Sequence, residues 1–97
     1  MVIVYGGVRV DPARVAEVTE AARTFQEKCR DEEGCVDYIL SWDLTEPNRI
    51  HLVEAWDSNG TAEAHKTRAH VKEWVTFIQE ASIEAPVFSR HSVATSG

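Results

Sequence analysis

Two side chains near the middle of the chain are of types that carry out proton transfer. Glu54 and Trp56 are two residues apart in an otherwise apolar, alternating segment, so in a strand they share one face. Desolvation in an apolar row raises the pKa of a carboxyl group, which suits it to general acid or base catalysis near neutral pH. The alternative interpretation is a structural glutamate that pairs with an arginine or a backbone amide at the sheet margin.

Two histidines and a tryptophan in the C-terminal half form a second group of candidates. His70 and Trp74 are four residues apart and share one side of an unbroken helix, and His65 comes five residues before His70. Histidine titrates near physiological pH, so such a pair at the border of a pocket could exchange protons with a weakly acidic substrate. Each histidine could equally cap a helix or lie at the solvent edge. We expect no metal site, because a spacing of five differs from the i, i+4 pair of a helical zinc site.

Other enzyme classes lack their sequence motifs. The chain has no GxGxxG after a strand, no GxxxxGK followed by Ser or Thr, and no GxSxG, so nicotinamide, nucleotide and serine-hydrolase chemistry have no support. Cys29 and Cys35 lack the CxxC spacing of a redox or zinc site, and we interpret both as small core or near-surface thiols. Tyr38 is interpreted first as a core or interface aromatic and second as a ring that stacks on a flat substrate.

The composition is typical of one small globular domain. The 97 residues are too few for two domains, and 43% hydrophobic with 27% charged residues is ordinary for a folded chain, so we expect a single domain over residues 1–97 with a core of about 2–93. A formal net charge of −6 disfavours nucleic acid and anionic membranes as partners. The apolar start of the chain ends at Gly6-Gly7 without a preceding basic residue, which predicts a cytoplasmic protein without a signal peptide or membrane span.

Two helical regions are predicted from apolar residues spaced by three and four. Residues 12–32 carry the stripe Val15, Val18, Ala22, Phe25 and Cys29, and Gly34 ends this helix. The second region follows the cap-rich residues 57–61 and contains His65, with a break expected near Arg68-Ala69. Its inner stripe is Val71, Trp74, Val75 and Ile78.

Four strands are predicted over residues 2–10, 36–42, 49–57 and 86–93. In the second of them Val36, Tyr38, Leu40 and Trp42 share one face, and in the third Ile50, Leu52, Glu54 and Trp56 do so. The order β-α-β-β-α-β predicts an α+β, ferredoxin-like fold with a four-stranded antiparallel sheet and helices on one face. The bare sheet face still carries Val, Ile and aromatic residues, so we expect a homodimer in which two such faces enclose a dimeric α+β barrel.

Several short stretches, in this order and at these spacings, resemble a known family. They are Glu33-Gly34-Cys35 with Tyr38, residues 43–49 (DLTEPNR), Glu54-Ala55-Trp56-Asp57, Ala62-Glu63-Ala64-His65 and Ala69-His70-Val71-Lys72. The set is similar to the antibiotic biosynthesis monooxygenase (ABM) domain, a family of dimeric α+β barrels. The resemblance runs from Gly34 to about Trp74.

The resemblance implies a function and roles for the candidate residues. Enzymes of the family oxygenate anthrones or hydroquinones to quinones without flavin, haem or metal, so it implies a small aromatic substrate, no cofactor and O2 as co-substrate. A base need only deprotonate the substrate, which then supplies the electrons itself. On this reading Glu54 or His65 accepts the proton, and Trp56 offers a ring face and an N–H donor. The substrate-binding residues are then His70, Trp74 and Tyr38.

Two differences from the family and two other functions stay open. Leu52 and Ala62 stand where the anthrone-oxidising members have Asn and Tyr, so the anthrone is not singled out as the substrate. Gly6-Gly7 stands where haem-degrading members have an Asn, so haem degradation is not expected. A non-catalytic ligand-binding or stress-associated barrel, and an isomerase or lyase on the same scaffold, are the alternatives, because a fold does not determine a function.

Overall fold

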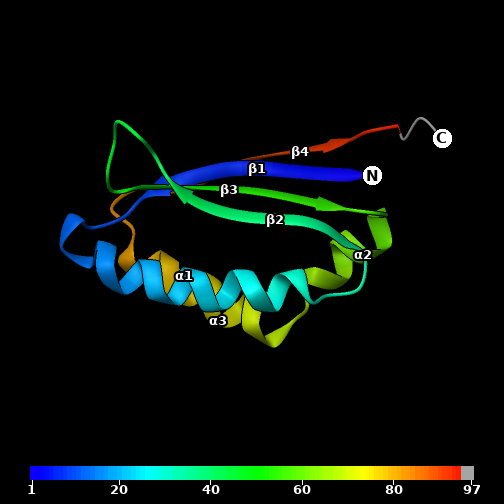
Figure 1. The fold of residues 1–97 in the computed structure, drawn as a ribbon, viewed down its shortest axis with the longest axis horizontal. Helices are drawn as coiled ribbons and strands as arrows, with labels where there is room; N and C mark the ends of the chain where they lie inside the picture. Colours follow the sequence, from blue (N-terminus) through cyan, green and yellow to red (C-terminus); the bar gives the residue numbers. More distant parts are fainter. Residues whose placement is uncertain (95–97) are drawn as a thin grey trace.

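The computed structural model describes residues 1–94 and shows a twisted sheet with helices on one side (Figure 1). The order of elements agrees with the predicted β-α-β-β-α-β fold, with the second helical region divided in two. The strands are β1 (Val2–Arg9), β2 (Cys35–Trp42), β3 (Arg49–Trp56) and β4 (Val87–Ser92). The helices are a short 3-10 turn, η1 (Pro12–Arg14), followed by α1 (Val15–Arg30), α2 (Asn59–His65) and α3 (Ala69–Ala81).

All neighbouring strands are antiparallel, and they lie in the order β2-β3-β1-β4. The hairpin of β2 and β3 was predicted from the turn at residues 45–48, and β1 lies between β3 and β4. Figure 1 shows α1 and α3 side by side beneath the sheet, while the opposite sheet face carries no helix. The structure thus confirms an α+β, ferredoxin-like fold with a four-stranded antiparallel sheet.

The core lies between the sheet and the helices, and β3 supplies its centre. Alternation places Ile50 and Trp56 on the helix-covered face, where they are 4% and 0% exposed, and Glu54 lies between them on the same face at 8% exposure. The helix α1 contributes its predicted stripe, of which Val18 and Cys29 are fully buried. The period of the sequence therefore placed these residues correctly.

Two predicted positions differ in the structure. A β-bulge between Cys35 and Asp37 shifts the register of β2, so Val36 leaves the inner face and is 53% exposed. Val75, predicted in the inner stripe of α3, is 42% exposed because a cavity separates that part of the helix from the sheet. Sequence periodicity reports neither a bulge nor the distance between a helix and a sheet.

The chain reverses at two predicted positions that position the site. Gly34 has φ of +79°, a left-handed conformation that favours glycine, and it turns the chain from α1 into β2. Arg68 is extended and separates α2 from α3, as the sequence predicted near Arg68-Ala69. Together these turns bring the end of α1 close to His65 and His70.

A search of residues 1–94 finds no helix with the length and apolar character that crossing a membrane requires.

Candidate active site

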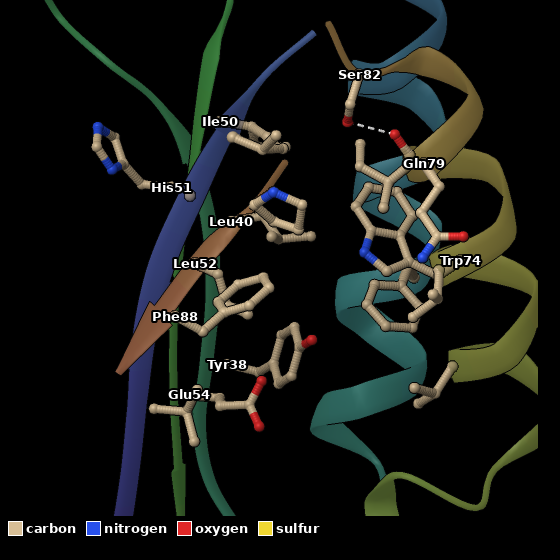
Figure 2. Close-up of a pocket in the computed structure, with 18 of the residues that line it drawn as sticks. Tyr38, Leu40, Ile50, His51, Leu52, Glu54, Trp74, Gln79, Ser82 and Phe88 are labelled. Carbon is tan, nitrogen blue, oxygen red and sulfur yellow. Dashed lines mark hydrogen bonds between the residues drawn. The ribbon is translucent and has the colours of Figure 1, made fainter. Parts of the chain in front are cut away.

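A cavity of about 550 Å³ lies between the helix-covered face of the sheet and α3. Its walls are mostly apolar side chains, and Figure 2 shows Leu40, Leu52 and Phe88 pointing into it from the sheet, opposite Trp74 of α3. The volume falls within the range of ordinary small-molecule sites, which are apolar with a few placed polar groups. The lining includes two buried acid or base groups, Glu54 and His65. Three less buried ones, at its margin, are His51, Lys66 and Glu84.

Glu54 lines the cavity and is 8% exposed. Its Oε1 accepts a hydrogen bond of 3.0 Å from Nε1 of Trp56. Figure 2 shows the carboxylate beside the ring of Tyr38, whose pKa is raised by burial and then by the Glu54 charge. Tyr38 is therefore a neutral phenol at physiological pH and can act as a donor but not as a base.

Trp56 is fully buried and does not line the cavity. It packs in the core cluster with Phe25 and Cys29, and its only ring N–H is donated to Glu54. The family resemblance implies that Trp56 offers the substrate a ring face and an N–H donor. In the structure it lies behind the cavity wall, where it orients the Glu54 carboxylate.

His65 also lines the cavity and is 5% exposed. Its Nδ1 lies 2.8 Å from Oε2 of Glu32, and its ring centroid is 4.6 Å from that of Trp56. An ionised carboxylate only accepts hydrogen bonds, so this contact places a proton on Nδ1. In the neutral imidazole the lone pair is then on Nε2, which has no hydrogen-bond partner among residues 1–94.

Glu32 is a residue of this site that the sequence reasoning missed. Its side chain is 6% exposed, and Oε2 also accepts a hydrogen bond of 2.9 Å from Nε2 of His70. Nε of Arg68 lies 3.4 Å from Oε1. A signal existed in the sequence, because Glu32 follows Cys29 by three residues and so continues the buried stripe of α1.

Of the two other candidates in α3, Trp74 lies at the cavity and His70 lies outside it. Trp74 lines it and stacks on Phe25, with ring centroids 4.7 Å apart and planes within 6°. His70 lies instead in a neighbouring groove between α1 and α3, where its Nε2 binds Glu32. The structure thus brings four of the six predicted site residues to the cavity, namely Glu54, His65, Tyr38 and Trp74, and leaves Trp56 and His70 behind its wall.

This arrangement is suited to proton transfer with a small, flat, apolar substrate. Glu54 and His65 face the same mostly apolar space. Glu54 accepts a hydrogen bond from Trp56 and His65 donates one to Glu32, and neither partner lines the cavity. An apolar wall excludes water, and the weaker screening strengthens interactions between charged groups and a substrate. Aromatic rings on both sides of the space offer faces on which a planar ring can lie.

Comparison with known proteins shows the family to which the chain belongs. The family model for antibiotic biosynthesis monooxygenases matches residues 1–76, and the chain belongs to that family. An uncharacterized protein of Synechocystis sp. is 30% identical over 74 residues, which cover 76% of this chain and 50% of that protein. The chain therefore spans about half the length of this curated relative.

Solved structures share the fold over nearly the whole chain. A candidate antibiotic biosynthesis monooxygenase from Deinococcus radiodurans superposes with a TM-score of 0.91 at 21% identity, covering 99% of this chain and 95% of its own. A second from Nitrosomonas europaea gives 0.90 at 22%, with 98% and 100% covered. A conserved protein from Methanosarcina mazei gives 0.87 at 24%, with 93% and 89% covered. At these identities the likeness shows the fold alone.

Proposed function

We propose that the protein is a cofactor-independent monooxygenase that oxidises a small phenol, anthrone or hydroquinone to a quinone with O2. The observation that carries this proposal is the apolar cavity of about 550 Å³ in which Glu54 and His65 are the candidate proton acceptors. Membership of the antibiotic biosynthesis monooxygenase family supports it. The assignment of the substrate class rests on the flat aromatic walls of the cavity.

The proposed reaction balances without an external reductant. A base removes a proton from the acidic phenol or ring C–H, and the resulting anion transfers one electron to O2. The two radicals recombine to a peroxide, which loses water as the carbon–oxygen double bond forms. One oxygen atom thus enters the quinone and the other leaves as water, while the substrate itself supplies the electrons and the two hydrogens of that water.

The protein's part is to accept the proton, orient the ring and exclude water. His65 is the stronger candidate for the base, since Glu32 holds its Nδ1 and leaves the Nε2 lone pair for the substrate. Glu54 is the second candidate, and the Trp56 hydrogen bond orients it in the same space. Trp74, held by its stacking on Phe25, presents one wall for the ring.

Oxygen uptake tests this function. Metal-free protein is offered a panel of anthrones and hydroquinones, and we expect O2 consumption that matches quinone formed. A His65→Asn or a Glu54→Gln variant that stays folded should lose most of this activity, by about 100-fold or more for the residue that acts as the base. Glu20→Gln, at an exposed position of α1, is the matched control and should retain full activity.

The other outcomes of this assay select among the alternatives. Turnover of a substrate without O2 consumption would contradict the oxygenase and favour an isomerase or lyase. Saturable binding without any turnover would favour a ligand-binding barrel. No uptake across the whole panel would refute the proposed function.

We also propose that the helix-free sheet face pairs with the same face of a second copy. Tyr5, Val53 and Ile39 lie opposite one another on β1, β3 and β2, and they are 51%, 42% and 38% exposed. Burial of this apolar row would stabilise the dimer. Sedimentation should show a dimer that Val53→Asp converts to a monomer, while Leu44→Asp, at a fully exposed loop position, does not. A monomeric parent protein would contradict this pairing.

A further inference from the structure

Four side chains with metal-binding atoms converge at the end of the helical layer. One of them comes from the last turn of α1, one from the turn that follows this helix, one from the last residue of α2 and one from the start of α3. Their ligand atoms, a thiol sulfur, a carboxylate oxygen and two imidazole nitrogens, all lie within 4.8 Å of one another. We call this the four-residue cluster; it consists of Cys29, Glu32, His65 and His70.

Only one of the two carboxylate oxygens of Glu32 accepts hydrogen bonds. Oε2 of Glu32 accepts two hydrogen bonds, but Oε1 is buried and has no hydrogen-bond partner among residues 1–94. A buried oxygen without a partner costs free energy, and native structures contain few of them. Arg68 lies 3.4 Å away at Nε but does not form a hydrogen bond to it. Glu32 therefore has one buried oxygen without a hydrogen bond, and its other oxygen is in contact with both imidazoles.

We propose that the four-residue cluster binds one Zn2+ ion. A thiolate, a carboxylate and two imidazoles are nitrogen, sulfur and oxygen ligands of the kinds that Zn2+ accepts in tetrahedral sites, whereas Mg2+ and Ca2+ require oxygen ligands. The two imidazole nitrogens that now donate to Oε2 would turn their lone pairs to the ion. The proton of His65 would then lie on Nε2, so in the metal-bound form Glu54 is the proton acceptor of the proposed function, and His65 has that role only in the metal-free form. On binding, the Cys29 thiol releases its proton to solvent as its sulfur coordinates the metal.

The spacing of the histidines alone predicted no metal site, and the proposal departs from that expectation. His65 and His70 belong to different helices, so the i, i+4 rule for a single helix does not apply to them. Cys29, in the last turn of α1, and Glu32, in the turn that follows it, supply the remaining ligands. The juxtaposition depends on the turn at Gly34 and the break at Arg68.

The cluster is accessible to an ion without unfolding. The His70 side chain is 21% exposed and lines a groove of about 320 Å³ between α1 and α3. Arg68 beside Glu32 is 45% exposed, so its guanidinium can move into solvent as the ion binds. Since that guanidinium repels a divalent ion, Arg68→Gln should tighten Zn2+ binding several-fold.

Binding of metal to the whole, metal-stripped chain tests the site. We expect one Zn2+ per chain in a calorimetric titration, with release of protons to the buffer. Co2+ in place of Zn2+ should show the visible bands of a tetrahedral ion and a near-ultraviolet band from a thiolate-to-cobalt transition. No substrate is present in these experiments, so their failure leaves the proposed oxygenase untouched.

Variants with matched controls identify the ligands. Loss of a residue that only hydrogen-bonds to a metal ligand weakens binding by about 10- to 100-fold. Cys29→Ser and Glu32→Gln remove a ligand itself, so each should weaken Zn2+ binding by more than that. Cys35→Ser and His91→Ala, which change the same residue types outside the cluster, should bind Zn2+ like the parent.

The Co2+ spectrum of the parent protein decides the question even where a variant at buried Cys29 does not fold. A bound Co2+ ion without the thiolate band would overturn the proposal. Unchanged Zn2+ affinity in Glu32→Gln, or no bound metal in the parent protein, would do the same.

Discussion

The hydrogen bond between Trp56 and Glu54 allows a quantitative test of the site's architecture. Trp56 is 0% exposed and does not line the cavity, so its N–H cannot replace the bond with water when Glu54 is removed. The Nε1–Oε1 distance is 3.0 Å. A hydrogen bond to a charged group contributes about 1.5–3 kcal/mol, compared with about 0.5–1.5 kcal/mol for a neutral pair. Trp56→Phe should therefore destabilise the protein through this bond in addition to the volume that it removes.

A double-mutant cycle separates the hydrogen bond from the change in packing. The free energy of unfolding in urea is measured for the parent, Trp56→Phe, Glu54→Leu and the double variant, and we expect a coupling of about 1.5–3 kcal/mol. The matched control is the bond from Nε1 of Trp42 to Oγ1 of Thr19, at 2.9 Å, which has a neutral acceptor. The cycle of Trp42→Phe with Thr19→Val should give about 0.5–1.5 kcal/mol.

The two cycles together test whether Trp56 orients the Glu54 carboxylate. A coupling for the Trp56 pair that is no larger than that of the Trp42 pair would show that Glu54 gains nothing from its buried position. Trp56 would then be a core residue that does not orient the carboxylate, and the case for Glu54 as a held proton acceptor would fail.

Three further predictions concern particular residues. Gly34→Ala should cost about 1–3 kcal/mol in urea unfolding, because φ is +79° and a Cβ would stand 2.4 Å from a neighbouring side-chain carbon; a loss under about 0.5 kcal/mol would contradict the strain. The hydrogen bond from His51, and then those from the following turn, hold the pKa of Asp43 well below its usual range. A lowered pKa stabilises the fold above the ordinary aspartate pKa and this is lost as the pH falls, so Asp43→Asn should show a smaller acid-induced drop in the urea midpoint than the parent. Burial and then the Glu54 charge raise the pKa of Tyr38, so the folded state holds the neutral phenol and loses stability as the pH rises above the ordinary tyrosine pKa. In an alkaline titration, the phenolate absorbance that the parent shows and Tyr38→Phe lacks should appear only when the circular dichroism signal of the fold is lost. Ionisation of Tyr38 in the folded protein would contradict its burial.

Local sequence patterns predict which residues form each element and, apart from Val36 at the β-bulge and Val75 beside the cavity, which of them share a face. The alternation in β3 places Glu54 and Trp56 together on the helix-covered side, and the stripe of α1 identifies its buried residues. The turns at Gly34 and Arg68 were also predicted, since extended and left-handed backbone has local chemical signals. These features depend on neighbours a few residues apart, so a local pattern records them.

Which of these residues meet, and which of them face the cavity, depends on contacts between elements that are distant in the sequence. Glu32 contacts His65 and His70 across 33 and 38 residues of sequence, and no periodic pattern encodes such a pairing. Trp56 shares a face with Glu54, yet one lies behind the cavity wall and the other on it, because α3 stands away from part of the sheet. The distance between α3 and the sheet is set by side chains from several elements that pack together. A short stretch of sequence contains only one of these elements, so it cannot predict that distance.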